Sequence, residues 1–353
     1  MHKADLDKLL SYAVEKEASD IHLSAGMPPV FRVHGTLRKL EMSPIVPERL
    51  LALISELLPP KQKKHFEETM ELDIAYAVPQ VARFRTNVYL QARGPAIAFR
   101  VIPEKIRTLE ELQCPPGIYH LARQHKGLVL VTGPTGSGKT TTMAAMLDLI
   151  NVERKDHILT IEDPIEYLHR SKNCLVNQRE LGEHTGSFAS ALRAALREDP
   201  DVILVGEMRD LETISLALTA AETGHLVFAT LHTMNAAETV NRVVDVFPPA
   251  QQGQVRAMFA NSVMGIVAQR LLPNADGHGR SAAHEIMVAT SAVRNLIREN
   301  KSHQMSSTIQ TGGAFGMQTL DMALRNLLRS GAISKENAEA HAQDKGFVTS
   351  SGA

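Results

Sequence analysis

One stretch constrains this chain more than any other: residues 133–140, which read Gly-Pro-Thr-Gly-Ser-Gly-Lys-Thr. They fit the pattern G-x-x-x-x-G-K-[ST], whose glycines let successive backbone N–H groups point at a polyphosphate. The apolar residues 127–132 before the stretch predict a buried parallel strand, and residues 141–147 after it predict the start of a helix. This setting distinguishes a phosphate-binding loop (P-loop) from a glycine-rich turn that matches by chance. The sequence therefore predicts a nucleotide site.

The residue types in the P-loop indicate what each of them would do. The Lys139 ammonium is expected to meet the β- and γ-phosphates, and the Thr140 hydroxyl to ligate Mg²⁺. The expected ligands are thus ATP and Mg²⁺. The residues predicted to hold the nucleotide here are Gly133, Pro134, Thr135, Gly136, Ser137, Gly138, Lys139, Thr140 and Thr141.

Composition excludes several other classes of protein. With 353 residues the chain has room for two domains. A net charge of −1, 4% aromatic residues and no tryptophan leave little for tracking or stacking on nucleic acid. No apolar run approaches the roughly 20 residues that span a bilayer, and the N-terminus does not resemble a signal peptide, so we expect a cytoplasmic protein. Two cysteines are too few for a four-thiolate zinc site.

The pattern of apolar residues divides the chain into two α/β domains. Residues 1–105 predict a small N-terminal domain, with helices near residues 5–18 and after Pro47. Residues 106–117, rich in proline, are expected to be a linker. Residues 118–353 predict the nucleotide-binding domain, which we expect to be helical from about residue 248, with helices at 255–272, 292–299 and 319–330.

The alternation of apolar and polar residues in 83–101 places three arginines on one side of a predicted hairpin. Because side chains alternate along a strand, Arg83, Arg85 and Arg100 share the face that is not buried. A solvated arginine face is the simpler interpretation. Ring-shaped P-loop ATPases commonly complete their sites with arginines from a neighbour, so we favour a functional role.

Polar residues follow several of the predicted strands of the nucleotide-binding domain. Glu162, Glu207 and His232 each stand at the carboxyl end of an apolar strand, and His225 precedes the strand that His232 ends. Ligands of open α/β sheets bind outside the carboxyl ends of the strands. We therefore expect Lys139, Glu162, Glu207 and His232 to gather at one edge of the sheet.

Five motifs together point to a family. They are the P-loop, the acidic residues 161–167, the strand and carboxylate of 198–207, the two histidines of 223–233, and residues 292–299. With them the sequence resembles the secretion ATPases of type II and type IV pilus systems, up to about residue 345. Residues 292–299 resemble the A-I-R-N-L-I-R-E signature of the retraction branch, with Val293 in place of isoleucine.

The resemblance implies a PAS-like N-terminal domain, a RecA-like ATPase domain, and a homohexameric ring with ATP between subunits. It implies that Arg85 and Arg100 correspond to N-domain arginines that reach the nucleotide, with Arg83 beside them. The implied partner is the inner-membrane platform protein of the pilus, which would hold the ring at the cytoplasmic face of that membrane. Many relatives carry serine at Thr140, and both side chains supply the hydroxyl.

The sequence leaves alternatives open at the site and for the function. We favour Glu207 for Mg²⁺ and the attacking water, with Glu162 as its rival. His225 and His232 are expected either to sense the γ-phosphate or a neighbouring subunit, or to be plain hydrogen-bond partners. The favoured function is an ATP-driven motor for pilus retraction, either the main motor or an accessory paralogue. A pilus-assembly or secretion ATPase is the first alternative, although such proteins typically carry a four-cysteine zinc element, and a nucleic-acid translocase is the second.

Overall fold

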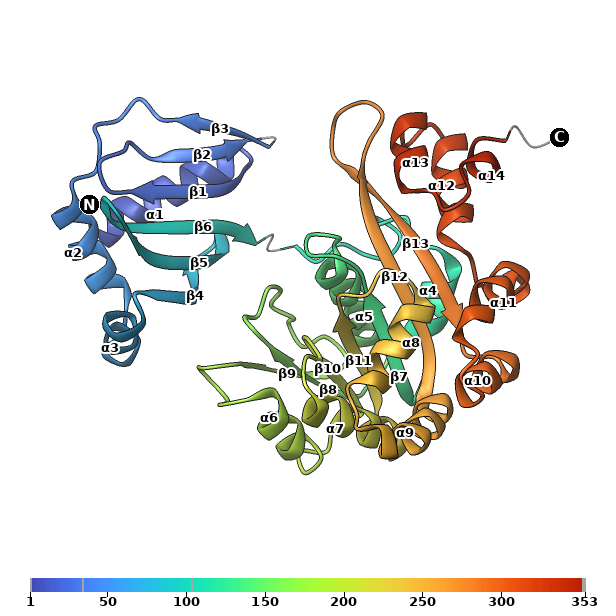
Figure 1. Cartoon of the computed structure of the whole chain (residues 1–353). Coiled ribbons are helices and arrows are strands. Elements are labelled where there is room, and N and C mark those ends of the chain that lie inside the picture. The colour runs from blue at the N-terminus through green and yellow to red at the C-terminus, as the bar shows by residue number, and fades with distance from the viewer. Residues whose placement is uncertain (1, 34, 103–104, 351–353) are drawn as a thin grey trace. The chain divides into compact units, whose positions relative to one another are not determined.

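The computed structural model describes residues 2–33, 35–102 and 105–350. The chain divides into two compact units (Figure 1). The first comprises residues 1–105 together with 164–168, and the second comprises 106–163 and 169–353. Residues 106–117, expected as a linker, belong to the second unit, where Leu109 is buried at 2% exposure. Among the described residues, no helix combines the length and apolarity that a membrane span requires.

The first unit is an antiparallel sheet of six strands in the order β3-β2-β1-β6-β5-β4, with helices packed on it. Its strands are β1 Ala18–Ser24, β2 Val30–Val33, β3 Thr36–Lys39, β4 Glu71–Val78, β5 Ala82–Gln91 and β6 Gly94–Ile102. Its helices are α1 Lys3–Glu15, α2 Pro47–Leu57 and α3 Pro60–Thr69. The sequence did not indicate α3, because a proline pair normally ends a helix; here Pro60 is the first residue of a new one, where its missing N–H costs nothing.

The predicted alternation of the hairpin is confirmed by the register of β5 and β6. Phe84 and Val88 are fully buried, and Arg85 lies directly opposite Arg100, with Arg83 two residues along the same strand. The pattern fails at the end of β5, where Leu90, which alternation would place on the same face as Phe84 and Val88, is 44% exposed.

The second unit is built on a seven-stranded sheet in the order β13-β12-β7-β11-β10-β8-β9, parallel except for β13. Its strands are β7 Gly127–Thr132, β8 His157–Glu162, β9 Leu175–Glu180, β10 Val202–Val205, β11 Leu226–Leu231, β12 Val263–Pro273 and β13 Arg280–Val288. Every residue of β7, β10 and β11 is buried, as expected for central parallel strands. The result is a mixed α/β fold, as expected for the nucleotide-binding domain.

Helices of the second unit pack around this sheet (Figure 1). One core cluster joins the sheet to α4 Pro116–Ala122 and α5 Lys139–Glu153. Another joins it to α6 Phe188–Ala195, α7 Leu211–Glu222, α8 Ala236–Asp245 and α9 Pro249–Ser262. The C-terminal elements are α10 Ser291–Arg298, η1 Ser302–Gln304, α11 Met305–Thr311, η2 Gly313–Phe315, α12 Leu320–Arg329, α13 Lys335–His341 and α14 Lys345–Thr349.

The expectation of an all-helical part from about residue 248 is wrong, because a hairpin interrupts it. The predicted helix 255–272 ends at Ser262, and β12 begins at Val263 and pairs with both β7 and β13. Residues 263–272 form a short apolar run, and periodicity alone does not separate a buried strand from a buried helix in such a run. These residues form a strand because they pair with β7, the strand that leads into the P-loop.

Candidate functional site

The P-loop connects the end of β7 to the start of α5. Gly138 is the residue before α5 and has φ +85°, while Gly133 and Gly136 have φ +140° and +79°. A Cβ atom at Gly133 would lie 2.3 Å from the Gln269 carbonyl oxygen, and one at Gly138 would lie 2.9 Å from Gln269 Nε2. At Gly136 no atom lies within 4 Å of the position that a Cβ atom would take. Two of the glycines therefore let β12 approach the loop, and the third leaves the loop open on its other side.

Lys139 is folded against its own loop. Its Nζ donates to the carbonyl oxygens of Gly133 and Pro134, at 2.8 and 3.0 Å. Thr140 follows in the first turn of α5 and is half-buried. The positive end of the α5 dipole and the Lys139 ammonium both favour an anion here, and the Thr140 hydroxyl is a ligand type that Mg²⁺ accepts. These residues fit a Mg²⁺-bound polyphosphate.

The parallel register brings the other predicted groups to the same edge of the sheet. β8 ends at Glu162, β10 is followed by Gly206 and Glu207, and β11 is followed by His232. β7, which leads into the P-loop, pairs in parallel with β11, so its carboxyl end lies at this edge too. The prediction that Lys139, Glu162, Glu207 and His232 lie along one edge agrees with this topology.

Glu207 is held between the guanidinium group of Arg209 and the imidazole ring of His232. One of its oxygens accepts a 2.7 Å hydrogen bond from Arg209 Nη2, and the other lies 3.0 Å from His232 Nε2. Partial burial alone would raise the pKa of this carboxyl, but the hydrogen bond and charge of Arg209, with a smaller contribution from His232, bring it below its usual range. Glu207 is therefore a carboxylate at neutral pH, suited to a metal or to orienting water.

Glu162 occupies a more enclosed position than Glu207. It is 8% exposed, and its Oε1 accepts hydrogen bonds from Thr160 Oγ1 at 2.7 Å and from Gln178 Nε2 of β9 at 3.0 Å. The side chain of Glu207 is 20% exposed. A group that must meet water and a bound metal needs access, so the difference in burial favours Glu207 for that role.

His225 does not join this group within the chain. It precedes β11, at the end of the sheet opposite the P-loop, and its Nδ1 lies 3.0 Å from the Ala220 carbonyl oxygen. The length of β11, at about 3.3 Å per residue, separates it from His232 by about 20 Å. Because side chains at the two ends of one strand lie on opposite edges of the sheet, His225 does not lie beside the P-loop of its own chain, and its expected role toward the γ-phosphate or a neighbouring subunit stays a prediction.

The three predicted arginines belong to the first unit. A cross-strand row there runs from Arg32 through Asp20 and Arg100 to Arg85, each directly opposite the next. Arg100 Nε donates to Asp20 Oδ1 at 2.9 Å, whereas Arg85 Nε is 3.9 Å from Asp73. Burial alone would raise the pKa of Asp20, but the hydrogen bonds from Arg100 and Ser19 bring it below its usual range.

Sequence reasoning missed two residues at the P-loop edge. Arg209, the partner of Glu207, stands only two positions after it, so a basic side chain next to the strand-end carboxylate was the available signal. Gln269 contacts the P-loop from β12, and no local pattern links it to residues more than 120 positions earlier.

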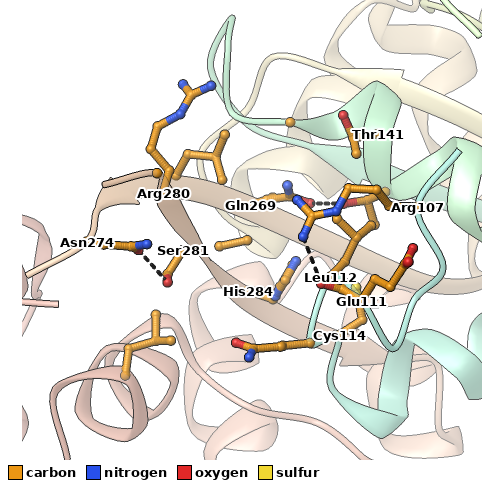
Figure 2. A pocket seen from close by; sticks show the side chains of 17 residues that line it. Arg107, Glu111, Leu112, Cys114, Thr141, Gln269, Asn274, Arg280, Ser281 and His284 are labelled. Carbon is orange, nitrogen blue, oxygen red and sulfur yellow. Dashed lines mark hydrogen bonds between the residues drawn. The ribbon is translucent and has the colours of Figure 1, made fainter. Parts of the chain in front are cut away.

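A cavity of about 510 Å³ opens beside the P-loop (Figure 2). Thr141 and Gly138 line it on one side, the hairpin β12–β13 lines it on another, and residues 107–114 complete it. His284, which also lines it, has Nε2 without a hydrogen-bond partner among the described residues, and burial lowers its pKa to about 4, so the ring is neutral. Volumes of this size suit small ligands.

Comparisons with known proteins agree with this geometry. The family model described as "Type II/IV secretion system protein" matches residues 2–344. The chain is 56% identical to the type IV pilus retractation ATPase PilT of Pseudomonas aeruginosa, over 96% of this chain and 98% of that protein. It is 54% identical to a twitching motility protein of Neisseria gonorrhoeae, over 90% of this chain and 84% of that protein.

A solved structure gives the same result for the fold. The crystal structure of the pilus retraction motor PilT with bound ADP superposes with a TM-score of 0.89 at 47% identity, covering 96% of this chain and 97% of that one. The match extends over both units of the chain. This chain therefore belongs to the type II/IV secretion system protein family.

Proposed function

We propose that this chain is an ATP hydrolase that drives retraction of a type IV pilus. The observation that carries the proposal is the arrangement of the P-loop, Glu207 and His232 at one sheet edge, in a chain that matches a pilus retraction ATPase over 96% of its length. The reaction is the hydrolysis of ATP to ADP and phosphate.

Each residue of the edge has a role in this proposal. The P-loop amides and Lys139 hold the phosphates, and the Thr140 hydroxyl, with Glu207 or Glu162, would hold Mg²⁺. A bound Mg²⁺ supplies charge neutralisation at the phosphate oxygens. Glu207 orients the attacking water, because it is an ionised carboxylate with more access than Glu162. The His232 ring, 3.0 Å from Glu207, sets the direction of that carboxylate.

The arginines complete the site from a second subunit. In a homohexamer, Arg85 and Arg100, with Arg83 beside them, would stabilise the charge that develops on the γ-phosphoryl group. His225, at the far edge of the sheet, is then available to a neighbouring subunit. The ring works at the cytoplasmic face of the inner membrane on the pilus platform protein, and an accessory paralogue is a further candidate partner.

The cavity beside the P-loop is the place for the nucleoside. It begins at Gly138 and Thr141, so a phosphate chain held by the loop leads directly into it. A base and ribose fit a cavity of about 510 Å³. The neutral His284 ring in its lining introduces no charge.

Steady-state ATP hydrolysis by the purified protein tests the enzymatic part. We expect Lys139→Ala and Glu207→Gln to lower kcat by at least about a hundredfold, the scale on which loss of one positioned charged group acts in such sites. Removal of Mg²⁺ by a chelator should abolish turnover, and added Mg²⁺ should restore it. Glu162→Gln is the matched comparison: if it removes turnover while Glu207→Gln retains it, the two carboxylates exchange roles.

A further inference from the structure

Gln269 lies at the point where the P-loop leaves the sheet. β12 pairs with β7 up to Ala268 opposite Thr132, so the next residue, Gln269, stands beside the start of the loop. The residue is 2% exposed and lines the cavity described above (Figure 2). It comes from the segment in which the sequence predicted a helix.

Both polar atoms of the Gln269 amide bind the P-loop and its helix. Nε2 donates to the Ser137 carbonyl oxygen at 2.7 Å, and Oε1 accepts from Thr142 Oγ1 at 2.7 Å. Because the Ser137 carbonyl oxygen can only accept a hydrogen bond, the Gln269 atom that faces it must be the amide nitrogen, and this fixes the orientation of the amide. One side chain thus joins the loop to the first turn of α5.

The bond to Ser137 determines where the next N–H group points. The Ser137 carbonyl and the Gly138 N–H belong to one peptide group, which is planar and trans, so they point in opposite directions. Since Gln269 draws the carbonyl toward β12, the Gly138 N–H points away from β12. Because N–H groups at a helix N-terminus bind anions by pointing at them, this orientation presents the Gly138 N–H to an anion on the side away from β12.

A purely space-filling role does not explain this arrangement. Burying an amide costs free energy unless its hydrogen bonds are made, and an apolar side chain of similar size would fill the same volume. The amide also lies close to the loop backbone: a Cβ at Gly138 would come within 2.9 Å of its nitrogen. The contact serves the conformation of the loop.

We propose that Gln269 is a positioning residue that holds the Gly138 N–H, and with it the second half of the P-loop, ready for the phosphates of the nucleotide. The inference rests on the proposed function, since it concerns the same nucleotide. It makes nucleotide binding by the P-loop depend on a residue of β12, which is far from the P-loop in the sequence.

Nucleotide affinity and thermal stability, measured separately, test this role. The variants are Gln269→Met, which keeps the volume, and Gln269→Glu, which accepts from Thr142 but does not donate to Ser137 when ionised. The Kd of a fluorescent ADP with Mg²⁺ should rise about tenfold or more in Gln269→Met, because the buried Ser137 carbonyl loses its donor, and further in Gln269→Glu, because an ionised carboxylate would also face that carbonyl oxygen. Thr142→Val, which retains the bond to Ser137, should raise it by less than about threefold.

The control is Gln251→Met, an exposed glutamine on α9, which should leave the Kd unchanged. A Gln269→Met protein with a lower Tm but the wild-type Kd would overturn the proposal and leave only a packing role. If that variant does not fold, Gln269→Asn, too short to reach both partners, carries the same expectation. Failure of the wild-type protein to bind ADP would instead contradict the proposed function.

Discussion

At the scale of single residues, the site depends on how its charges are held. Glu207 is ionised because Arg209 donates to it and His232 lies beside it, which outweighs the effect of partial burial on its pKa. The strand-end position of Glu207 could be predicted from the sequence, since a carboxylate after an apolar strand is a local pattern. A basic side chain two positions later was a local signal for Arg209, but only the structure shows that this 74% exposed side chain turns toward Glu207.

Removing Arg209 should shift the pH dependence of turnover. Arg209 lowers the pKa of Glu207, so in Arg209→Ala that pKa rises and Glu207 takes up its proton at a higher pH. The acidic limb of the kcat/KM profile should therefore move to higher pH, by less than about one unit because the arginine is exposed.

The control is Arg209→Lys, which retains a positive charge and should show a smaller shift. High salt should reduce the difference between wild type and Arg209→Ala, since it screens exposed charges. An acidic limb that stays in place in Arg209→Ala would show that Glu207 does not limit the rate in that pH range.

At the scale of elements, strand pairing determines the secondary structure where the periodicity of apolar residues fits both a helix and a strand. β5, β6 and β7 have clear alternation or clear apolar runs, and each forms where the sequence predicts it. β12 has an apolar run that fits a helix as well, and its partner β7 lies more than 100 residues away. Predicting a helix in place of β12 also hid a site residue, because Gln269 contacts the P-loop only when β12 lies beside β7.

The row of charged residues across the first unit gives a prediction at this scale. Asp20 fixes Arg100 from the neighbouring strand β1, so Asp20→Asn should lower turnover between about twofold and tenfold, the range for a lost charged hydrogen bond that is partly exposed. In an Arg100→Ala protein the same change should have no further effect, since Asp20 acts through Arg100. ATP hydrolysis by the two single variants and the double variant measures the coupling.

Asp73→Asn is the matched control for this cycle. Its carboxylate lies 3.9 Å from Arg85 Nε and is half-exposed, so its loss should change turnover little. If Asp20→Asn lowers turnover equally with and without Arg100, Asp20 stabilises the sheet and does not position the arginine.

At the scale of the whole molecule, the division into two units separates the P-loop from the arginine row. The second unit carries Lys139, Glu162, Glu207 and His232, and the first carries Arg83, Arg85 and Arg100. In the proposed homohexamer, a ring of subunits would bring both sets to each nucleotide. The near full-length match to a pilus retraction ATPase is consistent with this arrangement.

The most direct test of the account is pilus retraction in a cell that lacks this chain, complemented with wild type or with Lys139→Ala. Wild type should restore retraction, and Lys139→Ala should leave pili that extend and stay extended, because the P-loop no longer holds the phosphates. Retraction at the wild-type rate with Lys139→Ala would contradict the account. Loss of pili altogether in the cell that lacks the chain would contradict it too, since that outcome belongs to an assembly ATPase.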